Sequence, residues 1–181
     1  VNYRASEENV SMLLDELSMA MECINVACIA NNHVFDFGAR GFVDTLNASR
    51  RMTEESGGRF LFVGGGRTHA DASAPVLVGE YNTRTAVFAL AFQNSGTPLS
   101  WSADETSSGM GIAMGDFRDC VPTRTLLEIT RAKASGALVI VSIHFGSNWG
   151  WDIDPENITA AHALIDAGAD IVHEEYLVLL K

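Results

Sequence analysis

Polar side chains able to bind metal ions and transfer protons follow an apolar segment near the start of the chain. Asn31, Asn32, His33 and Asp36 come directly after the apolar run of residues 24–29. An amide oxygen is a hard, neutral ligand for a cation, and an imidazole titrates near neutral pH. The group therefore predicts either a metal and proton-transfer site or a polar turn whose Asn side chains bond to loop amides. These residues alone favour neither reading.

Two further histidines follow apolar segments in the same way. His144 ends the run of residues 137–143, which fits either a metal ligand or a capped strand end. His173 follows residues 170–172, although the two glutamates after it are more typical of a solvated tail. Because equivalent ends of parallel strands lie along one edge of a sheet, we expect these histidines to approach His33.

The elements that position these residues alternate between helix and strand. Apolar periodicity and capping residues predict helices over residues 6–21, 42–52, 123–134 and 155–167. Apolar runs predict strands over residues 24–29, 59–63, 75–79, 85–92, 137–143 and 170–172. Residues 137–143 are nearly all apolar, as in a strand buried on both faces of a parallel sheet.

Two segments carry no recognisable binding motif. The Gly64–Gly66 run lacks the spacing of phosphate-binding and dinucleotide-binding loops, so we interpret it as a tight backbone turn. Residues 93–120 are rich in Gly and Ser and lack periodicity, which predicts a long functional or mobile loop. Chemistry is therefore expected at the strand ends, with this loop as a second candidate surface.

Composition narrows the class of protein. The 181 residues are 47% hydrophobic and 19% charged, which is typical of one globular domain. A net charge of −11 argues against nucleic acid as a partner, because both surfaces are anionic. The sequence contains no apolar run long enough for a transmembrane helix. Cys23, Cys28 and Cys120 have no metal-binding spacing and are interpreted as structural, with a single disulfide left open.

Three stretches resemble a known family in their residues, order and separation. They are residues 29–38 (IANNHVFDFG), 142–150 (SIHFGSNWG) and 163–173 (ALIDAGADIVH). The chain is similar to the bacterial capsule synthesis proteins, the CapA-like poly-γ-glutamate biosynthesis proteins, which are related to calcineurin-like metallophosphoesterases. This resemblance implies an α/β layered sandwich of the αββα type. It also implies one partial domain over residues 1–181, incomplete at both ends.

The resemblance assigns a role to each candidate site residue. It makes Asn32 and His144 metal ligands and His33 the proton donor or phosphate-stabilising group, while Asp36 orients His33 or its loop. It also implies divalent Mn, Zn or Fe, with two ions in an intact site activating a water. By this resemblance, we expect the family's acidic Gly-Asp and Asn-Leu-Glu segments to precede residue 1. Residues 174–176 replace a Gly-His segment, so we expect a partial, mononuclear or empty site.

Two functions follow as expectations. The first is a role in capsule or poly-γ-glutamate synthesis, with metal-dependent, phosphoesterase-like hydrolase chemistry in the intact parent protein, acting on a small-molecule or polymer substrate. The family's location implies the cell envelope, although the chain carries no signal for it. The alternative is a non-catalytic domain that binds a glycan, a polyanionic peptide or a protein through residues 93–120 and the loop of Trp149 and Trp151. Exposed sheet edges would favour oligomerisation in either case.

Overall fold

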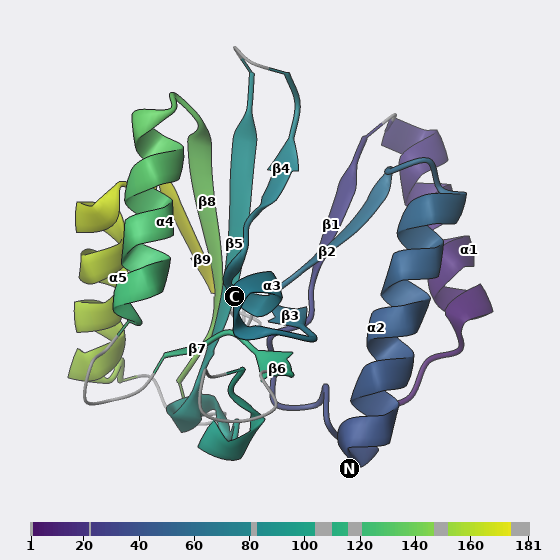
Figure 1. Cartoon of the computed structure of the whole chain (residues 1–181), viewed down its shortest axis with the longest axis horizontal. Helices are drawn as coiled ribbons and strands as arrows, with labels where there is room; N and C mark the ends of the chain where they lie inside the picture. The colour runs from purple at the N-terminus through teal and green to yellow at the C-terminus, as the bar shows by residue number, and fades with distance from the viewer. Residues whose placement is uncertain are drawn as a thin grey trace.

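The protein is layered in the order helix, sheet, sheet, helix, which confirms the α/β sandwich predicted from the sequence (Figure 1). The computed structural model describes residues 2–21, 23–80, 83–103, 110–115, 121–146 and 152–174. Helices α1 and α2 lie outside one sheet, and α4 and α5 lie outside the other. The helices are α1 (Glu7–Met21), α2 (Gly38–Glu55), α3 (His69–Ser73), α4 (Thr123–Ala134) and α5 (Pro155–Ala167), with 3-10 turns η1 (Gln93–Ser95) and η2 (Leu99–Trp101).

The strands form two main sheets and one short pair. In the first sheet, β1 (Asn25–Cys28) and β2 (Phe60–Val63) pair in parallel. The second sheet has the order β4–β5–β8–β9, and β7 also pairs with β5. Its strands are β4 (Val76–Val78), β5 (Thr85–Phe92), β7 (Met114–Gly115), β8 (Leu138–His144) and β9 (Ile171–Glu174), all parallel to their neighbours except β4, which is antiparallel to β5. The short pair joins β3 (Gly65–Gly66) to β6 (Gly111–Ile112).

Local signals in the sequence set the ends of several helices. The Ser6 hydroxyl accepts a backbone N–H three residues on, at 3.2 Å, and so caps α1. Helix α5 begins at Pro155, whose missing N–H is not needed in a first turn, and ends at Gly168 in the left-handed region with φ 118°. These boundaries match the predictions. Helix α2 is longer than the predicted 42–52, because its regular backbone already begins at residue 38.

Strand β5 separates two cores of different character. Its side chains alternate, so even-numbered residues face α4 and α5 while odd-numbered residues face the β1–β2 sheet. The helix-side core contains large residues, among them Phe88, Leu90, Ile129, Ile143 and Leu164. The core between the sheets contains smaller ones on this strand, namely Val87, Ala89 and Ala91. The two sheets can therefore approach closely along the odd-numbered face of β5.

The two sheets approach each other closely at Gly64. A Cβ atom at this position would come within 2.8 Å of the Cβ atoms of both Ala30 and Ala89, and φ is 94°. The Ala113 N–H donates to the Gly64 carbonyl at 3.0 Å, and the Ala113 carbonyl accepts from Ala91 at 2.9 Å. Backbone hydrogen bonds therefore join the end of β2 to the end of β5, which brings the ends of both sheets together.

The expectation that the three histidines share one sheet edge is wrong. Strand β1, which precedes His33, belongs to a different sheet from β8, which ends at His144. His173 lies within β9 opposite Ser142, and is thus two residues short of the level of His144. Because β1 pairs with β2 and this sheet packs over β5, His33 approaches His144 from the facing sheet.

Two predicted loops contain regular structure. Residues 93–120 include η1, η2, β6 and β7, although residues 104–109 and 116–120 are outside the described residues. The Gly64–Gly66 run turns at Gly64, but its last two residues form strand β3. Both segments were misread because their strands are two residues long and pair with distant partners, so no periodicity marks them.

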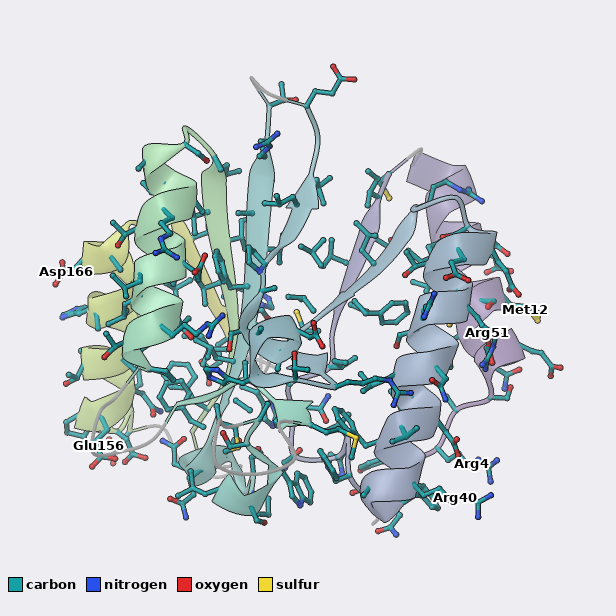
Figure 2. All side chains as sticks on the ribbon, in the orientation of Figure 1. Arg4, Met12, Arg40, Arg51, Glu156 and Asp166 are labelled. Atoms are coloured by element: carbon teal, nitrogen blue, oxygen red, sulfur yellow. The ribbon has the colours of Figure 1, made fainter. Side chains whose placement is uncertain are left out.

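The outer helices carry several exposed charged and apolar side chains. Arg51 on α2 donates to the Glu7 carboxylate at 2.6 Å and so links α2 to α1, while Met12 is 65% exposed and points outward (Figure 2). Among the described residues, none of the helices has the length and apolar character needed to cross a bilayer. Cys28 packs against the core between the sheets, in line with a structural role, and Cys120 lies outside the described residues.

Candidate functional site

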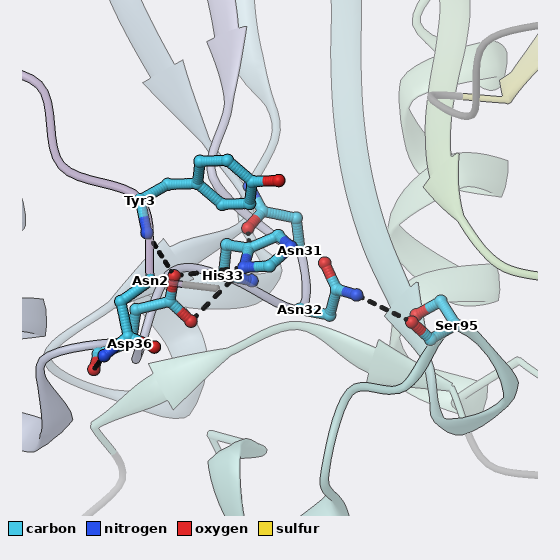
Figure 3. A network of polar contacts seen from close by, with 7 residues as sticks. All are labelled: Asn2, Tyr3, Asn31, Asn32, His33, Asp36 and Ser95. Carbon is cyan, nitrogen blue, oxygen red and sulfur yellow. Dashed lines mark hydrogen bonds and ion pairs between the residues drawn. The ribbon is translucent and has the colours of Figure 1, made fainter. Parts of the chain in front are cut away.

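His33 and Asp36 form a hydrogen-bonded pair in the turn between β1 and α2. The His33 Nδ1 atom lies 3.0 Å from one Asp36 carboxylate oxygen and 3.2 Å from the other (Figure 3). The His33 side chain is 41% exposed and that of Asp36 only 11%. A carboxylate on Nδ1 fixes the N–H on that nitrogen, so Nε2 is left to accept or donate a proton. The geometry suits proton transfer at an accessible imidazole.

The segment before α1 completes the surroundings of this pair. The Tyr3 backbone N–H donates to the Asp36 carboxylate at 2.7 Å, and the Tyr3 ring packs edge-on against the His33 ring with centroids 4.5 Å apart. The hydrogen bond from Tyr3 and then that from His33 hold the pKa of Asp36 below its usual range. Asp36 is therefore ionised at neutral pH and keeps His33 in one orientation. Sequence reasoning missed Tyr3, which no pattern connects to this turn.

Asn31 and Asn32 have different roles in the same turn. The Asn31 side-chain oxygen accepts the His33 backbone N–H at 2.9 Å, as a polar turn requires. Asn32 reaches across to η1, where its Nδ2 donates to the Ser95 carbonyl at 2.9 Å (Figure 3). Its Oδ1 is buried and has no hydrogen-bond partner among the described residues. Such an acceptor is costly to leave unpaired, so this position can take a hydrogen-bond donor or a cation.

Aromatic packing holds the turn in place. The Phe35 ring stacks on Phe42 of α2 at 4.3 Å between centroids and on Trp101 of η2 at 5.0 Å. Phe42 is fully buried, so the stack joins the turn to the core between the sheets. The polar residues on either side of Phe35 are therefore carried on a rigid support rather than on a free loop.

His144 faces the same region from the second sheet. Residues 139, 141 and 143 pack in the helix-side core, so alternation along β8 points His144 toward the space between the sheets. The side chain is buried, and burial together with repulsion from His33 lowers its pKa to about 4. His144 is thus neutral at pH 7, which is the form of imidazole that binds metal ions.

The turn after β8 is held by residues that the sequence did not indicate. The Gly146 N–H donates to the Asn94 side-chain oxygen at 3.0 Å, and Asn94 Nδ2 donates to the buried Asn157 side chain at 2.6 Å. Glu174, at the end of β9, lies next to Gly146, and burial raises its pKa. The one available signal for Asn94 was its position directly after a buried strand.

The structure assembles some predicted site residues and separates others. His33 and Asp36 are in contact, and Asn32 and His144 lie at the converging ends of the two sheets. His173 is not at this level, and Trp149 and Trp151 lie outside the described residues. Within the described ranges, no group of three or more His, Cys, Asp or Glu side chains is placed to hold a metal ion. The oxygen of Asn32 and a neutral His144 fit as two ligands, which is fewer than a complete set.

The fold and the site define a layered α/β protein with a histidine-containing polar site where its two sheets converge. The chain belongs to the family described as bacterial capsule synthesis protein PGA_cap, whose family model matches residues 1–175. This match confirms the family resemblance seen in the three sequence stretches.

Curated relatives carry related names. A probable polyglutamine synthesis accessory protein of Mycobacterium tuberculosis H37Rv is 36% identical over 149 residues, which cover 82% of this chain and 38% of that protein. The capsule biosynthesis protein CapA of Bacillus anthracis is 26% identical over 178 residues, 94% of this chain and 39% of that protein. The PGA biosynthesis protein CapA of Bacillus subtilis is 26% identical over 174 residues, 94% and 42% respectively. The chain thus spans about two-fifths of the length of these relatives.

Proposed function

We propose that this protein acts in the synthesis of a capsule-type poly-γ-glutamate polymer through metal-dependent hydrolysis of a phosphoester-like substrate. The family and the names of its relatives support the polymer. The observation that carries the chemistry is the buried, unpaired Oδ1 of Asn32 beside the His33–Asp36 pair. A hydrolase needs both a place for a cation and a group that moves a proton, and these features supply them.

Each residue has a distinct task in this proposal. Asn32 and His144 hold the cation from the two facing sheets. When bound, a divalent metal lowers the pKa of a coordinated water and polarises a phosphoryl oxygen. The ionised Asp36 holds the Nδ1–H of His33, so that Nε2 faces outward and transfers a proton to or from the leaving group. Mn²⁺, Zn²⁺ and Fe²⁺ all accept such a set of oxygen and imidazole ligands.

Hydrolysis of bis(p-nitrophenyl) phosphate by the purified protein in Mn²⁺ tests this function. His33→Asn removes the imidazole Nε2 that transfers the proton, and the expected loss in kcat is about 10²- to 10⁴-fold. His144→Ala should abolish activity through loss of Mn²⁺ binding, measured by calorimetric titration. His162→Ala is the matched control, because His162 lies exposed on α5 and should leave both measurements unchanged.

Two results would contradict the proposal. Equal heats of Mn²⁺ binding in the wild-type protein and His144→Ala would remove His144 as a ligand. Unchanged turnover in His33→Asn would remove His33 from the chemistry. Metal binding without any hydrolysis would favour a non-catalytic domain that uses the same site to bind an anionic polymer.

A further inference from the structure

One short segment contacts both halves of the candidate site. The 3-10 turn η1 follows β5 directly, and its Asn94 and Ser95 each reach a different sheet end. The Ser95 carbonyl accepts from Asn32, in the turn after β1, and the Asn94 side chain accepts from Gly146, two residues beyond His144. The segment therefore bridges the turn that carries Asn32 and the residues that directly follow His144.

The contact to Ser95 determines which way the Asn32 amide faces. A carbonyl oxygen can only accept, so the NH₂ group of Asn32 must point toward Ser95 and its Oδ1 must point away. The Ser95 hydroxyl itself bonds to the Phe92 carbonyl at 2.7 Å and to Thr97 at 2.9 Å. Both Ser95 and Thr97 are buried, so the carbonyl that orients Asn32 is fixed by its own turn.

The contacts of Asn94 fix the turn after β8 in the same way. Its oxygen accepts the Gly146 N–H and its NH₂ donates to Asn157, which is buried in the first turn of α5. Gly146 has φ 91°, a backbone conformation that glycine adopts readily and that residues with a side chain rarely adopt. Without Asn94, the Gly146 N–H would have to donate its hydrogen bond to water.

We propose that Asn94 is a positioning residue of the site: it holds the turn after β8 so that His144 stays opposite Asn32, whose amide the neighbouring Ser95 orients. This inference rests on the proposed function for the identity of the two ligands. The hydrogen bond from the Gly146 N–H to Asn94 does not depend on that assignment, because it forms without a metal ion. Residues that orient metal ligands change affinity by about ten- to a hundredfold when they are lost.

Amide hydrogen exchange of the metal-free protein tests whether Asn94 holds the Gly146 amide. In Asn94→Ala the Gly146 amide should exchange at least tenfold faster than in the wild type. Gln93→Ala, which removes an exposed amide from the same turn, should leave the rate unchanged. Asn94→Asp keeps the acceptor for Gly146, and Asn157 can turn its amide to donate to it, so this variant should retain slow exchange. Wild-type exchange at Gly146 in Asn94→Ala would overturn the inference.

Mn²⁺ binding tests whether Asn94 positions His144 as a metal ligand. Calorimetry should show ten- to hundredfold weaker binding in Asn94→Ala, near wild-type binding in Asn94→Asp and no change in Gln93→Ala. Pulsed EPR should show coupling of bound Mn²⁺ to an imidazole nitrogen in the wild type, and this coupling should be lost in Asn94→Ala. A variant that only lowers overall stability would keep this signal in its folded fraction.

The hydrogen-exchange and Mn²⁺-binding experiments distinguish failure of this inference from failure of the proposed function. If the wild-type protein shows no imidazole coupling, the assignment of His144 as ligand fails, and exchange at Gly146 still decides whether Asn94 holds the turn. If the wild type shows the coupling and Asn94→Ala retains both coupling and affinity, the positioning role alone is overturned.

Discussion

The two faces of strand β5 serve different purposes. Toward α4 and α5 the strand presents Phe88 and Leu90 to a core of large, fully buried side chains. Toward the other sheet it presents Ala89 and Ala91, and Gly64 lies against Ala89 with no room for a Cβ. The first face buries much apolar area, and the second allows close approach of two backbones.

This difference separates stability from the geometry of the site. Large residues on the helix side contribute most to the free energy of unfolding, because each removes more apolar surface from water. Small residues between the sheets contribute less, yet they allow the close approach of the two sheets next to the ends that carry Asn32 and His144. Substitutions on the two faces should therefore have effects of different kinds, and the following predictions test that separation.

The largest expected change in stability comes from the helix side. Ile129 on α4 is fully buried, and Ile129→Ala should lower the free energy of unfolding by about 2–5 kcal/mol in urea titrations. Leu127→Ala on the same helix is the control, because Leu127 is 52% exposed and should change stability by less than about 1 kcal/mol. Mn²⁺ affinity of the folded protein should stay at the wild-type value in both. A loss of Mn²⁺ affinity in Ile129→Ala would show that the helix-side core also controls the geometry of the site.

The next effect concerns pH and the buried imidazole on the site side. The folded-state pKa of His144, about 4, lies below its usual value of 6.5, so the unfolded state takes up the proton first. The contribution of the neutral His144 to the free energy of unfolding is therefore complete above pH 6.5. It decreases by roughly 3 kcal/mol as the pH falls toward 4. Urea titrations of metal-free protein between pH 7 and 4 measure this loss.

His144→Gln should remove this part of the pH dependence, and His162→Gln should keep it, because His162 is exposed. An identical pH profile in the wild type and His144→Gln would show that the imidazole is not held neutral between the sheets.

Gly64→Ala tests the close approach of the two sheets directly. The added Cβ would meet the Cβ atoms of Ala30 and Ala89 at 2.8 Å, so the sheets must move apart. Gly136→Ala is the matched control, since Gly136 has a similar φ of 87° but nothing within 4 Å of a Cβ. The excess loss of stability in Gly64→Ala over this control should be about 2 kcal/mol.

The site should respond to Gly64→Ala as well. NMR shifts of the Asn32 side-chain amide should change in this variant and not in Gly136→Ala, because Ala30 precedes the turn that carries Asn32. Equal stability losses and unchanged Asn32 shifts would show that the spacing of the sheets does not control the site.

The same division explains how far the sequence predicts this molecule. The His33–Asp36 pair spans three residues, so a local motif was enough to find it. Helices α4 and α5 and strands β5 and β8 were predicted because caps and apolar runs mark them within the segment itself.

Features that depend on distant partners were missed or misread. The membership of β1 in a separate sheet follows from its pairing with β2, which no local pattern shows. Asn94 and Ser95 act on residues 52 and 63 positions away, and the segment that contains them has no periodicity. The Gly64 turn was recognised, but its cause is contact with Ala30 and Ala89, which only the packed sheets reveal.

The smallest expected change in stability belongs to the residue that matters most for the proposed chemistry. Asn32→Ala removes one hydrogen bond to Ser95, but it also removes a buried oxygen that has no partner among the described residues. These terms oppose each other, so metal-free stability should change by no more than about 1 kcal/mol, while Mn²⁺ affinity should fall at least about tenfold.

Asn157→Ala provides the contrast on the helix side, where a buried amide is paired. Its loss leaves the Asn94 NH₂ without an acceptor, and stability should fall by about 1–3 kcal/mol. The two asparagines would then differ, because the Asn157 amide is paired by the fold, whereas the buried Asn32 Oδ1 has no hydrogen-bond partner among the described residues. If Asn32→Ala proves as destabilising as Asn157→Ala, the Asn32 oxygen has a partner in the metal-free protein, which would contradict its proposed role as a metal ligand.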